Sequence, residues 1–282
     1  MRKHAAFVAK WLWRHLVGQR ASQRLIGAVA RLAGVDLLVY AYKQIGILKC
    51  EDFHATGERH VVRDVLKQRL RKPDPIFFDV GANLGNYSAE LRSHFPGAQL
   101  YAIEPNPHTF KTLSARLQSA KDHCFCVAFG DAVESRPIYT YDRELNSSHS
   151  SILKEVFLDI HRNKNISSFD IHLTRLDDFC EANQIERIDF LKIDTEGYEL
   201  NVLKGAERML RENRIAMIQF EFNSMLVCSR VFLRDFYALL GQYEFFRMDS
   251  NRLIPLAEYD ARNEIFQFQN IFCCQREIDR YR

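Results

Sequence analysis

The sequence lacks the patterns that mark a zinc-binding or disulfide-bonded chain. It has seven cysteines, an odd number, and no two of them form a C-x-x-C pair. Several lie inside apolar runs, so we expect buried free thiols and a reducing compartment. The same spacing argues against a zinc site built from cysteine.

Long apolar runs are also missing. No uninterrupted stretch is long enough to span a bilayer. Lys10 and Arg14 interrupt the apolar region that a signal peptide would need. We therefore expect a cytoplasmic protein, or one held peripherally on the inner face of a membrane.

Acidic residues are absent from the first 35 positions, which carry seven lysines and arginines. The whole chain has a net charge of +3, so the remainder is net acidic. A nucleic-acid binder would be basic over its working face, and this distribution argues against one. Residues 1–57 are expected to form a basic, amphipathic helical arm with a break near Gly18. The arm either contacts an anionic membrane or packs on the body or on a second subunit.

Strand and helix patterns alternate from residue 58 onward. The expected strands are 76–80, 100–103, 124–129, 188–193, 215–222, 243–248 and 265–274, with helices at 84–94, 107–119, 175–183, 199–211 and 230–240. This order predicts one domain over 58–282 with an α/β, Rossmann-like, doubly wound fold around a mostly parallel seven-stranded sheet. The last two strands have no helix between them and should form an antiparallel hairpin. Residues 132–174 interrupt the alternation, and an insertion this long is more often functional than accidental.

Acidic residues follow the expected strands at the points where they end. They are Asp79, Glu104, Asp131, Asp194 and Glu221. In a doubly wound sheet, ligands bind outside the carboxyl ends of the strands. The sequence therefore predicts a ligand site along this edge.

The first loop, 79–85, reads DVGANLG and lacks the G-x-G-x-x-G signature of nicotinamide enzymes. It suits a smaller zwitterionic group, such as the amino-acid tail of S-adenosylmethionine. Asp79 would bind the ammonium directly or through water, Glu104 the ribose hydroxyls and Asp131 the adenine amino group. The expected cofactor-binding set is Asp79, Gly81, Asn83, Gly85, Glu104 and Asp131.

A second group of acids follows the strand 188–193 in the pattern D-x-E-G-x-E. Asp194 and Glu196 would lie beside the reacting centre. The alternative is a helix start, in which Asp194 lies near the cap and Glu196 and Glu199 interact favourably with the helix dipole.

Together these motifs resemble the FkbM family of S-adenosylmethionine-dependent methyltransferases. The matching stretches are FFDVGANLGNYS (77–88), YAIEPNP (101–107), VAFGD (127–131), TRLDDFC (174–180), IDFLKIDTEGYELNVLKGA (188–206) and IQFEFN (218–223). Thr195 departs from the Val or Met usual in such families. The resemblance implies methyl transfer to a hydroxyl of a sugar, a glycan or glycolipid, or a natural product.

An alcohol is a weak nucleophile, so a general base is useful. Asp194 is the first candidate, Glu196 and Glu221 are the reserves, and His149 is a more remote one. A divalent metal held by Asp194, Glu196 and Glu221 is an alternative way to activate the hydroxyl, although no histidine ligands are evident nearby in the sequence. The rival functions are a nicotinamide-dependent oxidoreductase and a catalytically inactive membrane-associated binding module.

Overall fold

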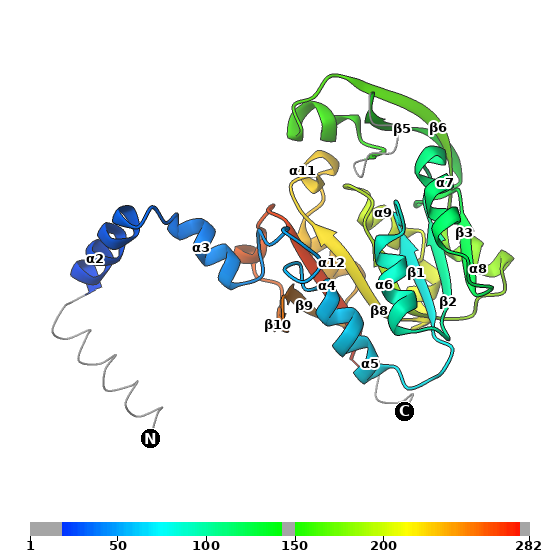
Figure 1. Cartoon of the computed structure of the whole chain (residues 1–282), viewed down its shortest axis with the longest axis horizontal. Helices are drawn as coiled ribbons and strands as arrows, with labels where there is room; N and C mark the ends of the chain where they lie inside the picture. The colour runs from blue at the N-terminus through cyan, green and yellow to red at the C-terminus, as the bar shows by residue number, and fades with distance from the viewer. Residues whose placement is uncertain (1–18, 143–149, 277–282) are drawn as a thin grey trace. The chain divides into compact units, whose positions relative to one another are not determined.

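The computed structural model describes residues 19–142 and 150–276 of the chain (Figure 1). The part of the expected helical arm before residue 19 lies outside these residues. The chain divides into two compact units, Met1–Ile45 and Gly46–Arg282.

The smaller unit contains α2 (Gln19–Leu32) and α3 (Leu37–Gln44). Asp36 caps α3, because its carboxylate accepts hydrogen bonds from the backbone N–H groups of Leu38 and Val39 at 2.8 and 3.1 Å. Apolar side chains of both helices are exposed: Leu25, Ile26, Val29, Leu32, Leu37, Leu38, Val39 and Tyr40. Among the described residues, no single helix has the length and apolar character to cross a membrane. Of the helix pairs in the described residues, only α2 and α3 reach that length and apolar character together, and this pair is bent by 99°.

The boundary between the units lies earlier than the expected one at residue 57. The Leu48 N–H donates to the Phe268 carbonyl at 2.9 Å, and Lys49 forms an ion pair with Asp249. Residues 46–57 are thus held by the last strands of the larger unit.

The larger unit is built on an eight-stranded sheet with the order β10-β9-β11-β8-β7-β1-β2-β3. The strands are β1 (Ile76–Val80), β2 (Gln99–Ile103), β3 (Asp122–Phe125), β7 (Ile188–Ile193), β8 (Ile215–Phe222), β9 (Tyr243–Asp249), β10 (Arg252–Pro255) and β11 (Gln269–Gln275). Five adjacent strands of this sheet are parallel, namely β8, β7, β1, β2 and β3. The next strand, β11, pairs antiparallel with both β8 and β9. The predicted mostly parallel, doubly wound class is confirmed, and β10 adds an eighth strand at one edge.

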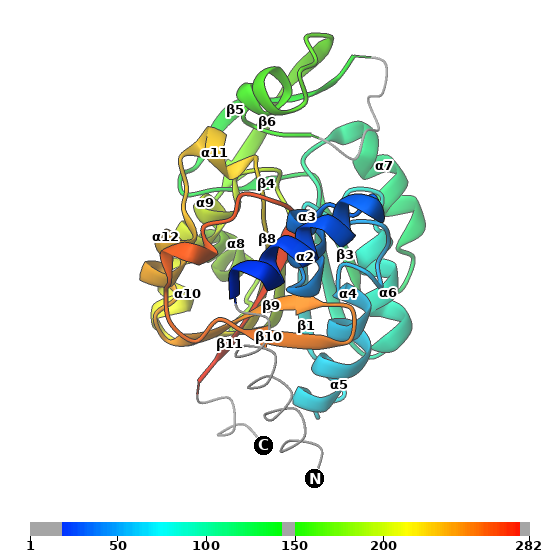
Figure 2. The same cartoon turned by 90° about the vertical axis from the view of Figure 1, so that its left-hand side faces the viewer.

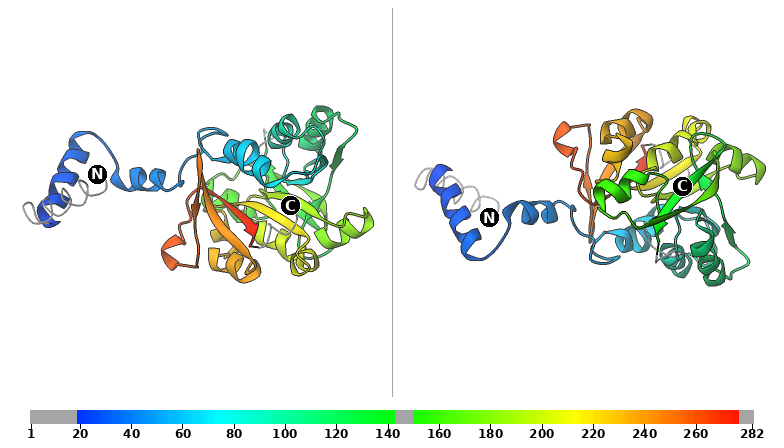
Figure 3. Two further views of the ribbon diagram at one scale, coloured as in Figure 1. Left: turned by 90° about the horizontal axis from the view of Figure 1, so that it is seen from below. Right: turned by 90° about the horizontal axis from the view of Figure 1, so that it is seen from above.

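Helices cover both faces of this sheet (Figure 3). They are α4 (Glu58–His60), η1 (Val61–Val65), α5 (Leu66–Arg69), α6 (Asn86–His94), α7 (Pro107–Arg116), α8 (Leu176–Ala182), α9 (Glu199–Lys204), α10 (Glu207–Arg211), α11 (Leu226–Ser229), α12 (Leu233–Leu239) and the short η3 (Ala261–Asn263). Successive side chains of β1 serve opposite faces. Phe77 is buried in the core cluster that includes Leu91 of α6, and Phe78 in the one that includes Phe179 of α8.

The expected strand 124–129 is wrong in its extent. The third strand of the main sheet ends at Phe125, and β4 (Ala128–Phe129) belongs to a separate sheet with β5 (Glu134–Tyr141) and β6 (Ile166–Thr174). The 132–174 insertion is therefore a long antiparallel hairpin, with η2 (Val156–Ile160) between its strands. Figure 2 shows this hairpin at one end of the larger unit, near α11.

The expected helix 199–211 is divided into α9 and α10 at Gly205. A Cβ at this position would lie 2.0 Å from the Gly130 carbonyl oxygen, so the chain passes very close to β4 here. Asp177 of α8 accepts hydrogen bonds from the Arg208 and Met209 N–H groups at 2.8 and 3.0 Å. This carboxylate caps α10 from another helix, which the local sequence does not reveal.

We expect Asp177→Ala to lower the free energy of unfolding by about 2 kcal/mol or more, because two buried N–H groups lose a charged acceptor. For a domain of this size the melting temperature should fall by about 4 °C or more, measurable by circular dichroism. Asp178→Ala is the matched control, since Asp178 lies in the same helical turn but is exposed. Equal melting temperatures for the two variants would contradict the capping role.

Candidate functional site

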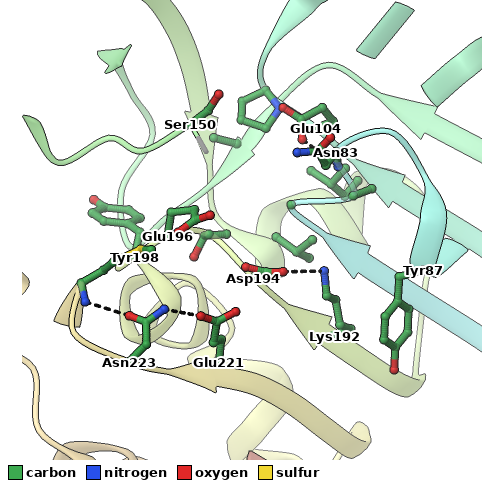
Figure 4. Close-up of a pocket in the computed structure, with 18 of the residues that line it drawn as sticks. Asn83, Tyr87, Glu104, Ser150, Lys192, Asp194, Glu196, Tyr198, Glu221 and Asn223 are labelled. Atoms are coloured by element: carbon green, nitrogen blue, oxygen red, sulfur yellow. Dashed lines mark hydrogen bonds and ion pairs between the residues drawn. The ribbon is translucent and has the colours of Figure 1, made fainter. Parts of the chain in front are cut away.

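A cavity of about 610 Å³ lies at the carboxyl ends of the central parallel strands. Its wall includes the first loop, the ends of β2, β7 and β8, and Glu58 from the segment that precedes β1. Ile138, Ser150 and Ile152 of the insertion also line it, as expected for a functional insertion. Figure 4 shows the polar residues that face this cavity.

Gly81 allows the first loop to approach the end of β7. Its φ is +76°, and a Cβ there would lie 1.7 Å from the backbone oxygen of Asp194. The N–H groups of Gly81 and Ala82 both donate to the Ile103 carbonyl at 2.9 Å. Only glycine tolerates both the positive φ and the close approach to the Asp194 backbone, which accounts for this residue at this position.

Glu104 joins the first loop to the end of β2. One carboxylate oxygen accepts from the Asn83 N–H and the other from the Asn106 N–H, both at 2.9 Å. Asn83 has a φ of +49°, a conformation that asparagine tolerates. Burial raises the pKa of Glu104 to about 7. A carboxylate has further acceptor sites, so Glu104 can still bind two ligand hydroxyls.

Lys192 is a buried cation in the floor of the cavity. Its Nζ lies 3.2 Å from an oxygen of Asp79 and 3.2 Å from an oxygen of Asp194, and 5.3 Å from the centre of the Tyr87 ring. Burial lowers its pKa, but the negative charges of Asp194, Asp79 and Glu58 outweigh that effect, and the net pKa is raised. Lys192 therefore stays charged at neutral pH.

Glu221 lies on the other side of Asp194 (Figure 4). Asn223 donates a hydrogen bond to its carboxylate, and the Met225 N–H donates to Asn223 at 2.8 Å. Burial, together with the charges of Asp194 and Glu196, raises the pKa of Glu221 well above its usual value. This shift favours the protonated form of Glu221.

Glu196 adopts a left-handed backbone conformation with a φ of +56°, which is uncommon for a residue other than glycine. Its carbonyl accepts a hydrogen bond from the Ser151 hydroxyl of the insertion at 2.8 Å. Glu199 accepts from the Thr195 and Gly197 N–H groups at 2.8 and 3.2 Å. The sequence offered Asp194, Glu196 and Glu199 as acids at the start of a helix. Of these, Glu199 is the one that lies in the first turn of α9.

The structure brings most of the predicted site residues together. Asp194, Glu196, Glu221, Gly81, Asn83 and Glu104 line the cavity, whereas Asp79, Gly85 and Asp131 do not. Asp131 follows β4 on the surface, where its carboxylate accepts from the Tyr198 hydroxyl at 3.4 Å. His149 lies outside the described residues. Among those described, no three His, Cys, Asp or Glu side chains are arranged to hold a metal ion.

Sequence reasoning missed Glu58, Tyr87, Lys192 and Asn223, all of which line the cavity. Lys192 had a signal, because a lysine inside the apolar run FLKI needs a buried partner. Glu58 had none, since it lies in no expected strand, helix or motif.

We expect Lys192→Met to lower the free energy of unfolding by about 3 kcal/mol or more, because it leaves the buried Asp79 carboxylate without its cation. Asp79→Asn added to this variant should restore part of the loss, since no unpaired charge then remains. Urea unfolding of both variants measures the difference. A double variant no more stable than Lys192→Met would contradict the pairing.

Comparison with known proteins is consistent with these observations. The sequence model of the methyltransferase FkbM domain matches residues 79–235, more than half of the chain. The hexuronic acid methyltransferase AglP of Haloferax volcanii is 24% identical over 163 residues, 58% of this chain and 62% of that protein. The 2-O-methyltransferase NoeI of Sinorhizobium fredii is 27% identical over 191 residues, 62% of this chain and 74% of that protein.

The match to the Haloferax protein thus spans about three fifths of its length. A solved structure, the methyltransferase FkbM from Methylobacillus flagellatus KT, aligns with a TM-score of 0.46 at 15% identity, over 78% of this chain and 49% of that one. The extent of the domain match confirms the resemblance found in the motifs: the chain belongs to the FkbM methyltransferase family.

Proposed function

We propose that this protein is an S-adenosylmethionine-dependent O-methyltransferase that acts on a hydroxyl of a sugar, a glycan or glycolipid, or a natural product. The observation that carries the proposal is that one cavity is lined both by Glu104 and the Gly81 loop, which suit the cofactor, and by Asp194 and Glu221, which suit the acceptor. The names of the relatives support it, since they describe methyltransferases of hexuronic acid and of a 2-hydroxyl position.

The residues present fit this cofactor. Glu104 would accept hydrogen bonds from the ribose hydroxyls, and Gly81 leaves room for a ligand to lie against the backbone. Val127, Ala128 and Phe129 line the wall beyond Glu104 and offer an apolar surface to adenine. When bound, S-adenosylmethionine supplies an electrophilic methyl group together with its leaving group.

Asp194 is the proposed proton acceptor for the hydroxyl. Its side chain is 36% exposed and lines the cavity, with Lys192 beside it. The raised pKa of Glu221 favours its protonated form, so we assign its carboxyl group to binding the acceptor rather than to removing the proton. The chain's main contribution is to align the hydroxyl and remove its proton.

Calorimetric titration with S-adenosylmethionine and with NAD⁺ tests the cofactor assignment. Binding of the first and not of the second supports a methyltransferase, and the reverse supports the oxidoreductase. Binding of S-adenosylmethionine without methyl transfer to any acceptor in host extract would favour the inactive binding module.

Asp194→Asn should lower turnover by about a hundredfold or more while cofactor affinity changes only a few-fold. The substitution keeps the shape of the side chain and removes its charge, and Lys192 keeps Asp79 as a partner. Transfer of a labelled methyl group to the acceptor, with calorimetry on the same sample, provides both measurements. Unchanged turnover would exclude Asp194 and direct attention to Glu196 and Glu221.

We also propose that the N-terminal arm contacts an anionic membrane surface. Arg20, Arg24 and Arg31 share one side of α2, whereas Leu25 and Val29 lie opposite and are exposed. A basic stripe beside an exposed apolar one is typical of a helix that lies in the membrane interface.

Replacing Arg20, Arg24 and Arg31 by Gln in the full chain should greatly weaken sedimentation with anionic vesicles, since each such charge contributes up to about 1 kcal/mol. Raised salt should release the unmodified protein in the same way. Uncharged vesicles are the control. Unmodified protein that ignores anionic vesicles at low salt, or a lipid-independent change of molecular mass in the variant, would favour packing or self-association instead.

A further inference from the structure

Asp79 is the strand-end acid that the sequence assigned to the cofactor's ammonium group, but it is fully buried and does not line the cavity. One of its carboxylate oxygens accepts from the Ser88 hydroxyl at 2.7 Å, and the other lies 3.2 Å from the Lys192 ammonium. A cation of the protein itself already occupies the place beside Asp79. An ammonium group of a ligand in the cavity needs a different anion.

Glu58 is an acidic residue that lines the cavity at the Lys192 side. Its Oε1 accepts from the Gln219 amide at 3.3 Å, and its Oε2 accepts from the Thr56 hydroxyl at 2.9 Å. Gln219 stands next to Lys192 in the sheet register and accepts from the Tyr87 hydroxyl at 2.7 Å. These contacts place Glu58 close to Tyr87 and Lys192.

The other carboxylates of the cavity have different partners. Glu104 joins the first loop to β2 at the ribose side, and Glu221 and Glu196 lie with Asn223 on the opposite side of Asp194 from Lys192 and Tyr87 (Figure 4). Glu58 uses two of about four acceptor positions of its carboxylate on Gln219 and Thr56, so it can accept further hydrogen bonds.

Resting on the proposed function, we propose that Glu58, which precedes the family domain, binds the α-ammonium group of the cofactor's amino-acid tail. Glu58 lies in the segment before β1, outside the matched range 79–235. Gly57, with a φ of +84°, packs its backbone against Asp249 and sets the position of Glu58.

Two ligands separate the tail from the rest of the cofactor. S-Adenosylhomocysteine carries the tail, whereas 5′-methylthioadenosine keeps the adenine, ribose and thioether and lacks it. Glu58→Gln should weaken S-adenosylhomocysteine about tenfold or more and leave 5′-methylthioadenosine unchanged, because only the first loses a charged hydrogen bond. Gln can keep its contacts with Gln219 and Thr56, and the melting temperature reports whether the fold is intact.

Glu104→Gln is the matched control, because it changes the same chemical group at the ribose side. It should weaken both ligands by a similar factor. An analogue of S-adenosylhomocysteine that lacks only the α-amino group should bind the unmodified protein and Glu58→Gln alike. Equal effects of Glu58→Gln on S-adenosylhomocysteine and 5′-methylthioadenosine, or no effect on either, would overturn the inference. Failure of the unmodified protein to bind either ligand would overturn the proposed function instead.

A second readout is the proton balance of binding. Burial raises the pKa of Glu58 to about 7, with Lys192 lowering it and Asp194 and Asp79 raising it, and Thr56 donating to it. A bound ammonium group favours the ionised form, so S-adenosylhomocysteine should expel part of a proton near pH 7 and bind more tightly as the pH rises from 6 to 8. Calorimetry in buffers of different ionisation enthalpy should detect a larger release for unmodified protein than for Glu58→Gln, in which only Glu104, whose pKa is also raised to about 7, still contributes. Identical release in both proteins would contradict the assignment.

Discussion

The ion pairs of Lys192 with Asp79 and Asp194 are the interactions on which the cavity depends. Lys192 lies in a strand whose six residues are all buried, where a lone ammonium group would be very costly. It is stable there because Asp79 lies directly beside it on β1 and Asp194, just past the end of β7, also forms an ion pair with it. One cation thus neutralises a buried carboxylate and holds a second one at the edge of the cavity. Its position also decides which anions remain for a ligand, since Asp79 is no longer accessible.

The backbone around this group is closely packed. The Gly81 loop lies against the Asp194 carbonyl, and Glu104 joins the same loop to the start of α7 through the Asn83 and Asn106 N–H groups. The proposed ribose site and the proposed base are therefore linked by direct backbone contacts. Distance between bound cofactor and proton acceptor matters strongly in transfer reactions, and this packing sets that distance through backbone contacts.

The sequence predicted those parts of the fold that local pattern determines. Apolar runs such as 76–80 and 188–193 become strands with the expected bounds, and the acids after them meet at one edge because parallel strands end there. Prediction failed where distant contacts decide. Gly205 ends α9 because β4 passes close to it and Asp177 caps the next helix. The strand expected over 124–129 divides because Ala128 and Phe129 pair with β6, more than forty residues later in the chain. The packing of Gly57 against the Asp249 backbone places Glu58 in the site, and no local motif indicates this contact.

The acids of the cavity have different surroundings, and this separates their proposed roles. Desolvation and the neighbouring negative charges raise the pKa of Glu221, and the hydrogen bond that Asn223 donates opposes this rise. Asp194 is 36% exposed and forms an ion pair with Lys192 at 3.2 Å. Both acids line the cavity proposed for the acceptor hydroxyl. Neighbouring acids whose environments drive their protonation apart are the arrangement from which acid and base roles follow. These surroundings are the basis of the proposal that Asp194 removes the proton and Glu221 binds the acceptor.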